Sequence, residues 1–150
     1  MILSAQSIRK RAGLITPFTD RRVLMGMTYG LGPAGYDVRI AENKIIRPGE
    51  FFLASTMEKF NMPDDVVAMV KDKSSWARKG IVLQNTVIEP GWRGYLTLEI
   101  THHGEQAITL TRGMPIAQIV FMQMDEPTEN PYNGKYQDQP EGPQEAIEEK

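Results

Sequence analysis

Residues 85–100 have the sequence NTVIEPGWRGYLTLEI. The Pro-Gly pair at 90–91 predicts a turn, because Pro sets φ at the second turn position and Gly tolerates the third. After the turn, polar and aliphatic side chains alternate with period two, which predicts a strand. Tyr95, Thr97 and Glu99 would share one face of this strand, and the aliphatic residues between them would share the other.

Glu99 is a carboxylate in the middle of this predicted strand. It shares a face with Thr97 and follows a second carboxylate, Glu89, in the turn, so these groups could line a pocket. Burial there would raise the pKa of Glu99 and suit it to proton transfer near neutral pH. The alternative is a solvated strand glutamate, and the local pattern leaves both interpretations open.

Residues 71–80 precede this strand and have the sequence KDKSSWARKG. Because Ser is a favoured N-cap, a short helical turn is expected to begin at Ser74 and Ser75. Arg78 would lie one turn beyond Ser74 on the same face, and Lys73 would lie beside the helix N-terminus. These groups can converge on an anion, most naturally a phosphate. A capped helix with a solvated Lys and Arg explains the same spacing.

Short strands separated by turns are expected in the rest of the chain, including residues 66–70, 107–110 and 116–122. Residues 1–11 are expected to form a helix with Ser4 as its cap and an apolar stripe of Ile2, Leu3 and Ile8. The pattern predicts an all-β sandwich or barrel with a short N-terminal helix. We expect a folded domain over residues 1–130 and a mobile tail over residues 131–150, with a solvated acidic end.

The composition is that of one compact domain, with 150 residues, 41% hydrophobic and 24% charged. A net charge of −2 argues against a general nucleic-acid or membrane binder, and no apolar run is long enough for a signal peptide or a membrane span. The lack of cysteine removes thiolate chemistry and fits a reducing cytoplasm. His102 and His103 would point to opposite faces of a strand, so a zinc site is not expected.

Four segments carry a resemblance to a known family. KSSWARKG at 73–80 and IEPGWRGYLTLEI at 88–100 resemble the dCTP deaminases of the dUTPase-like superfamily. AGYDVRI at 34–40 is similar to the first motif of dUTPases and to the Asp-Leu-Arg-Leu of the deaminases. PYNGKYQDQPEGP at 131–143 resembles the deaminase tail that closes on the triphosphate. The resemblance thus spans nearly the whole chain.

The resemblance implies a dUTPase-like β-clip, or distorted jelly roll, that forms a homotrimer with active sites shared between subunits. It implies zinc-independent hydrolysis of dCTP to dUTP and ammonia, a step of pyrimidine deoxynucleotide biosynthesis toward dUMP and dTTP. Magnesium would be carried by the triphosphate rather than by a protein cage. By the same resemblance, dTTP is a candidate feedback inhibitor.

The resemblance also assigns roles to individual residues. Glu99 would be the proton shuttle that activates water for attack at C4 of cytosine, and Ser74 and Arg78 would hold the water and polarise the base region. The remaining nucleotide contacts would be Lys73 and Ser75 at the phosphates, Glu89 at the 3′-hydroxyl, Trp92 at the sugar, the backbone at Thr97 and Leu98 at the base edge, and Gln118, Tyr132, Lys135 and Gln139 around the ligand and its triphosphate.

Two positions depart from the family pattern. Lys73 stands where the family has Arg, which keeps the charge but loses bidentate phosphate recognition. Glu89 stands where both deaminases and dUTPases have Asp, and its extra methylene shifts the carboxylate. Because AGYD at 34–37 and IEPGWRG at 88–94 also resemble dUTPase motifs, the alternatives are a dUTP pyrophosphatase, against which Glu89 counts, and a bifunctional enzyme giving dUMP and pyrophosphate. A non-catalytic nucleotide-binding module is a further alternative.

Overall fold

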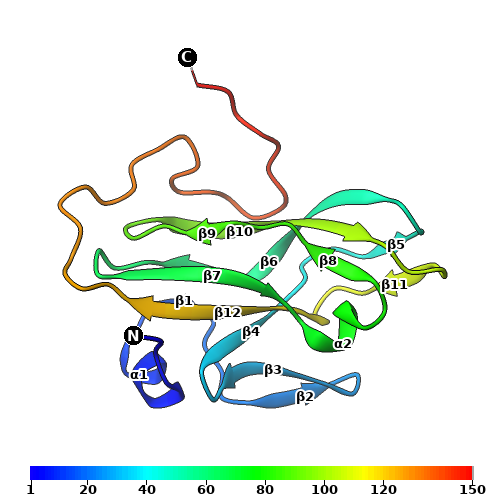
Figure 1. The fold of residues 1–150 in the computed structure, drawn as a ribbon, viewed down its shortest axis with the longest axis horizontal. Helices are drawn as coiled ribbons and strands as arrows, with labels where there is room; N and C mark the ends of the chain where they lie inside the picture. Colours follow the sequence, from blue (N-terminus) through cyan, green and yellow to red (C-terminus); the bar gives the residue numbers. More distant parts are fainter. Residues whose placement is uncertain (150) are drawn as a thin grey trace.

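The computed structural model describes residues 1–149 of the chain. Lys150, the last residue of the predicted tail, lies outside the described residues. Within this range the elements are α1 (Ala5–Lys10), β1 (Ile15–Thr16), β2 (Arg22–Leu24), β3 (Met27–Gly32), β4 (Gly35–Arg39), β5 (Lys44–Ile46), β6 (Phe51–Asn61), β7 (Val66–Asp72), α2 (Ser74–Ala77), β8 (Ile81–Leu83), β9 (Val87–Ile88), β10 (Arg93–His102), β11 (Ile108–Leu110) and β12 (Pro115–Gln123). Figure 1 shows their arrangement, with the tail crossing above β9 and β10.

The strands form three antiparallel sheets. A four-stranded sheet has the order β1-β6-β10-β8, a six-stranded sheet has the order β2-β3-β4-β12-β7-β9, and β5 pairs with β11. Register shifts interrupt β10 between Tyr95 and Thr97 and β12 between Pro115 and Ala117. The predicted strands at 66–70, 95–100, 107–110 and 116–122 correspond to β7, β10, β11 and β12. The predicted all-β class with a short N-terminal helix is confirmed.

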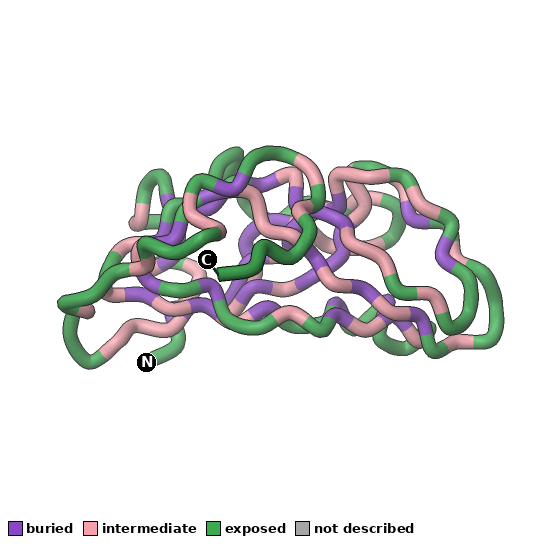
Figure 2. The backbone as a smooth tube through the Cα atoms, turned by 90° about the horizontal axis from the view of Figure 1, so that it is seen from above, coloured by how far each residue is buried: buried purple, intermediate pink, exposed green. Residues whose placement is uncertain are grey.

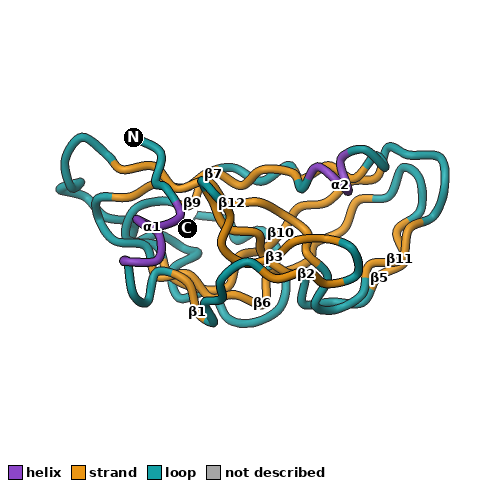
Figure 3. The backbone as a smooth tube through the Cα atoms, turned by 90° about the horizontal axis from the view of Figure 1, so that it is seen from below, coloured by secondary structure: helices purple, strands orange, loops and turns teal. Residues whose placement is uncertain are grey.

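The core lies between the two larger sheets. Phe60 of β6 and Phe121 of β12 are both fully buried, and their ring centroids are 6.5 Å apart. Buried segments follow the strands through the middle of the molecule, while the turns and the C-terminal end are exposed (Figure 2). The two helices lie at opposite ends of this sheet structure (Figure 3). The fold therefore rests on contacts between sheets rather than on helices.

The N-terminal helix is shorter than the sequence predicted. Residues 1–3 run beside β12 instead, where the Leu3 N–H donates to the Phe121 carbonyl at 2.8 Å. Ile2 is 59% exposed and so does not belong to an apolar stripe. Ser4 precedes α1, but its hydroxyl contacts the Ser7 hydroxyl at 3.2 Å and does not cap the helix. Pairing with a strand satisfies backbone groups that a longer helix would have bonded internally.

A buried ion pair joins the two larger sheets. The Glu58 carboxylate on β6 is 0% exposed and accepts hydrogen bonds from the Arg39 backbone N–H at 3.0 Å and from the Arg39 Nε–H at 2.8 Å. Burial raises the pKa of Glu58, and the hydrogen bonds from Arg39 on β4 oppose that change. The ionised pair thus links the two sheets. Its contribution to stability depends on both partners, because either charge alone would be buried without a counter-charge.

Replacing Arg39 by Ala would leave the Glu58 carboxylate buried without its cation. We expect Arg39→Ala to lower the free energy of unfolding by about 3–5 kcal/mol, measured by urea denaturation at one fixed protein concentration. The matched control is Arg9→Ala, because Arg9 pairs with Asp20 on the exposed surface and such pairs contribute little. Equal losses in the two variants would contradict a structural role for the Arg39–Glu58 pair.

Candidate active site

A cavity of about 760 Å³ lies between the tail and the face formed by β9 and β10. Its lining comes from β6, from Val70 of β7, from the segment 85–99 and from the tail, so residues far apart in sequence meet there. The predicted site residues that line it are Glu89, Trp92, Thr97, Glu99, Tyr132, Lys135 and Gln139. The structure therefore brings more than half of the predicted nucleotide contacts to one place.

Glu99 lies on β10 at the wall of this cavity and is half-buried. Burial raises the pKa of its carboxyl group, which is the first of the two interpretations that the sequence left open. Leu98 and Ile100, its neighbours on the strand, are fully buried on the opposite face. The predicted alternation is therefore confirmed around Glu99, and Leu98, which was predicted to meet the base edge, does not line the cavity.

Asn85 was missed by the sequence analysis. Its side-chain Nδ2 donates to the Thr97 carbonyl at 2.7 Å, and its Oδ1 accepts from the Glu99 N–H at 2.9 Å. It also lines the cavity. Its only sequence signal is its position two residues after the short apolar run 81–83, which many loop asparagines share.

The tail is held against β10 at Thr97 and Gly94. The Thr97 hydroxyl accepts from the Gln139 Nε2 at 2.5 Å and from the Gln144 backbone N–H at 3.0 Å. Gly94 has φ 145°, and a Cβ built there would lie 2.6 Å from the Gln139 nitrogen. Gly94 thus permits the close approach through which the tail forms a parallel bridge with β10.

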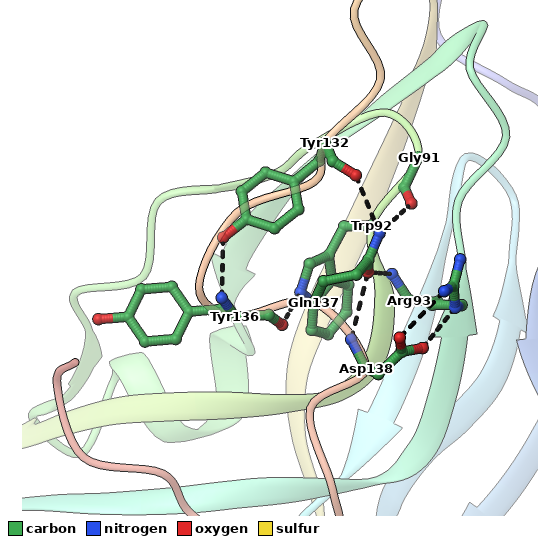
Figure 4. Close-up of polar contacts among 7 residues, drawn as sticks. All are labelled: Gly91, Trp92, Arg93, Tyr132, Tyr136, Gln137 and Asp138. Atoms are coloured by element: carbon green, nitrogen blue, oxygen red, sulfur yellow. Dashed lines mark hydrogen bonds and ion pairs between the residues drawn. The ribbon is translucent and has the colours of Figure 1, made fainter. Parts of the chain in front are cut away.

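A second set of contacts fastens the tail to the turn before β10 (Figure 4). The Gln137 Nε2 donates to the Gly91 and Tyr132 carbonyls, each at 2.9 Å, and its Oε1 accepts from the Arg93 N–H at 2.8 Å. Arg93 also forms an ion pair with Asp138. Gln137 and Asp138 were not predicted as site residues, because nothing in a polar tail marks which side chains fold back.

Two of the predicted sugar and phosphate contacts are part of this attachment. The Trp92 indole is buried and its Nε1–H donates to the Tyr136 carbonyl at 2.7 Å. The Tyr132 hydroxyl accepts from the Tyr136 N–H at 3.1 Å. Lys135 lies 5.4 Å from the centre of the Tyr136 ring and 3.5 Å from the Glu149 carboxylate. The aromatic residues thus shape the cavity wall, and Lys135 supplies a cation beside it.

A separate cavity of about 280 Å³ contains Lys73, Ser74 and Gln118 in its lining. Lys73 is only 8% exposed, and its ammonium group lies 2.8 Å from the Asp37 carboxylate and 3.2 Å from the Thr28 hydroxyl. The charge of Lys73 is therefore already matched within the chain, which the sequence did not predict.

The helical turn after Lys73 is present, but the predicted serine cap is wrong. Lys73 is the N-cap residue, no side chain caps the helix, and the Lys73 carbonyl accepts from the Trp76 and Ala77 N–H groups, each at 2.9 Å. The helix begins at Ser74 because the extended backbone of Lys73 already provides the first acceptor. The Arg78 N–H bonds the Ser74 carbonyl at 3.1 Å, which confirms the predicted one-turn spacing.

The two cavities stay separate within one chain. Among residues 1–149, none lines both cavities, and Ser75 and Arg78 line neither. Ser74, Ser75 and Arg78 are exposed. The residues predicted to act on the base therefore lie apart from Glu99 in the single subunit.

The two histidines lie as predicted, on opposite faces. His102 is 1% exposed; its Nδ1 accepts from the Gly104 N–H at 3.2 Å, which leaves Nε2 to donate to the Gln106 carbonyl at 2.6 Å. His103 is exposed. Over the described range, no group of three or more His, Cys, Asp or Glu side chains could hold a metal ion. No helix in that range is long and apolar enough to cross a membrane.

Solved structures resemble this fold. The 2′-deoxycytidine 5′-triphosphate deaminase of Agrobacterium tumefaciens superposes with a TM-score of 0.65 at 23% identity, over 80% of this chain and 47% of that one. The EIAV dUTPase superposes with a TM-score of 0.58 at 22% identity, over 79% of this chain and 94% of that one. At these identities the likeness shows a shared fold.

Comparison of the sequence with known proteins identifies the family, which the shared fold alone does not. A Pyrococcus horikoshii protein named dCTP deaminase is 36% identical over 152 residues, which cover 91% of this chain and 92% of that protein. A Campylobacter concisus protein of the same name is 34% identical over 166 residues, covering 89% and 88%. Residues 36–124, more than half of the chain, match the family described as dCTP deaminase-like. The chain therefore belongs to the dCTP deaminase-like family.

Proposed function

We propose that this protein hydrolyses dCTP to dUTP and ammonia without zinc. The observation that carries the proposal is Glu99, a half-buried carboxylate with a raised pKa at the wall of a nucleotide-sized cavity. Thr97, two residues before it, lines the same cavity. The names of the relatives at 36% and 34% identity support dCTP as the substrate.

In this mechanism Glu99 moves protons between water, the ring and the leaving group. Its carboxylate takes a proton from water as the water oxygen bonds to C4 of cytosine, and it delivers that proton to the ring nitrogen N3. It then takes the proton of the new C4 hydroxyl and gives it to the amino group. The C4–N bond breaks, ammonia leaves and the carbonyl of uracil forms. A carboxyl group with a raised pKa suits both transfers.

The proposed site is completed by another copy of the chain. Ser74, Ser75 and Arg78 lie on the exposed surface around α2, apart from the cavity that contains Glu99. A homotrimer in which α2 of one subunit faces the Glu99 cavity of its neighbour would place Arg78 and Ser74 at the base and Ser75 and Gln118 toward the phosphates. Closed symmetry of this kind repeats the same contact at each site.

The tail would close the nucleotide into the cavity. Residues 131–150 form the proposed closing segment, residues 1–130 the catalytic part, and Lys135 would meet a phosphate. Magnesium, bound to the triphosphate, would offset the negative charge of the substrate there. In pyrimidine deoxynucleotide synthesis the product would lead to dUMP, with dTTP as a candidate inhibitor and the cytoplasm as the expected location.

A second activity is hydrolysis of dUTP to dUMP and pyrophosphate. The observation that bears on it is that Glu89, which stands where dUTPases have Asp, lines the same cavity as Glu99. A second carboxylate in the site could activate water for attack at phosphorus, so a bifunctional enzyme remains the alternative to a deaminase that stops at dUTP. A chain that binds nucleotides without turnover is the third outcome.

We expect the purified protein with dCTP and magnesium to release ammonia and dUTP, and Glu99→Gln to lower this rate by about 10²–10⁴-fold because the proton shuttle is lost. Ammonia and pyrophosphate are measured together, so pyrophosphate with dUMP would identify the bifunctional form. Binding of dCTP to Glu99→Gln is the control for folding. Wild-type turnover in Glu99→Gln would contradict the role of Glu99 as proton shuttle. Tight binding of dCTP by the wild-type protein without any product would indicate a non-catalytic binding module.

The raised pKa of Glu99 has a consequence for the pH profile. The carboxylate form starts the reaction, so kcat/KM should fall as the pH drops through the pKa of Glu99 in the free enzyme. Because burial raises that pKa, the acid limb should lie above the ordinary glutamate value of about 4.3. An acid limb below that value, with the protein still folded, would show that Glu99 is not the base.

Shared sites predict complementation between two inactive variants. Glu99→Gln and Arg78→Ala should each be inactive alone, yet subunits exchanged after mild denaturation should regain up to about a quarter of wild-type activity, because one site in four then combines an intact Glu99 with an intact Arg78 from a neighbour. The double variant mixed with itself is the control. Light scattering checks the trimer, and mixtures without activity would contradict a shared site.

A further inference from the structure

The edge of β10 that faces the cavity lacks a strand partner beside Glu99. On one side β10 pairs with β6 along most of its length. On the other side β8 pairs only with residues 100–102, and the last backbone bond runs from the Gln84 N–H to the Glu99 carbonyl at 2.9 Å. Beyond it the chain turns toward β9, so the Glu99 N–H and the Thr97 carbonyl have no backbone partner from β8.

The side chain of Asn85 takes the place of that missing strand. Its Oδ1 accepts from the Glu99 N–H at 2.9 Å and its Nδ2 donates to the Thr97 carbonyl at 2.7 Å. A primary amide offers one acceptor and two donors in a plane, so it can reproduce the donor and acceptor of a peptide group. Asn85 thus continues the ladder by two bonds, on either side of Leu98.

The two hydrogen bonds of Asn85 lie next to an irregularity in the pairing of β10. The register of β10 against β6 shifts between Tyr95 and Thr97, so the ladder is interrupted just before Glu99. The hydroxyl of Thr97 is at the same time the acceptor for Gln139 and Gln144 of the tail. The position of the Glu99 backbone therefore depends on the hydrogen bond to Asn85. The tail contacts the same strand at Thr97, two residues before Glu99.

We propose that Asn85 is a positioning residue that sets where the Glu99 carboxylate stands in the cavity. The proposal rests on the proposed role of Glu99 as proton shuttle. Asn85 acts through the backbone of Glu99 and Thr97, so its effect on the chemical step should exceed its effect on nucleotide binding. A displacement of about 1 Å at a reacting group is enough to cost on the order of 100-fold in rate.

The first test is Asn85→Ala. We expect kcat for dCTP deamination to fall by about 10- to 100-fold. The dissociation constant of dCTP, measured by calorimetry in the Glu99→Gln background, should change by less than about threefold, because uniform binding is kept. The matched control is Asn43→Ala, since the Asn43 Oδ1 also accepts a backbone N–H, from Arg112 at 2.8 Å, away from the cavity. Its kcat should stay at the wild-type value.

The second test is Asn85→Asp, which has the shape of Asn but adds a negative charge beside Glu99. A like charge disfavours the ionised form, so the pKa of Glu99 should rise and the acid limb of kcat/KM should move to higher pH. The other charged groups that line the cavity are the same in both proteins: Glu89, Lys135, Glu145 and Glu149. A substitution that only destabilised the fold would lower activity without moving the limb.

The outcomes separate the inference from the proposed function. If the wild-type protein releases no ammonia from dCTP, the proposed function fails. If the wild type and Glu99→Gln behave as expected while Asn85→Ala keeps wild-type kcat, or while Asn85→Asp leaves the acid limb in place, only the role of Asn85 is overturned. Melting temperatures of all variants are measured in parallel, and a kcat loss that merely follows the folded fraction also overturns it.

Discussion

The pairing of β10 with β6 is the constraint on which the rest of the structure depends. It fixes the faces of β10, so that Leu98 and Ile100 enter the core while Thr97 and Glu99 face the cavity. Because side chains on a strand alternate, the same ten residues hold the two larger sheets together and carry the proposed catalytic group. A slip by one residue would bury Glu99 in the core and empty the site.

The tail also binds to β10. It forms hydrogen bonds to Thr97 and approaches Gly94 along the edge where β10 is irregular. One wall of the cavity is therefore formed by β10 and another by the tail. Several of the contacts involve exposed groups such as Arg93 and Asp138. Segments held by hydrogen bonds at the surface are the ones that open at low free energy. Under the proposed function, these contacts would break and re-form as nucleotide enters and leaves.

Much of this could be predicted from the sequence, because the signals concerned are local. The period-two alternation around Glu99, the Pro-Gly turn before it and the one-turn spacing of Ser74 and Arg78 all depend on residues close together in the chain. Opposite faces for His102 and His103 follow from the same rule. The strands and the all-β class could therefore be predicted from local patterns, whereas the choice of Glu99 came from the family resemblance, because the local pattern also fits a solvated glutamate.

The sequence by itself determined the fold class, the family and the identity of the candidate shuttle. Only the tertiary structure decided that Lys73 is paired with Asp37, that residues 1–3 join β12 rather than α1, and that Asn85 replaces a strand beside Glu99. Each of these outcomes depends on a partner distant in the chain or on a gap in a sheet, neither of which leaves a periodic pattern. A side chain forms hydrogen bonds with the groups that packing brings within about 3 Å of it. The residues next to it in the sequence do not determine which groups those are.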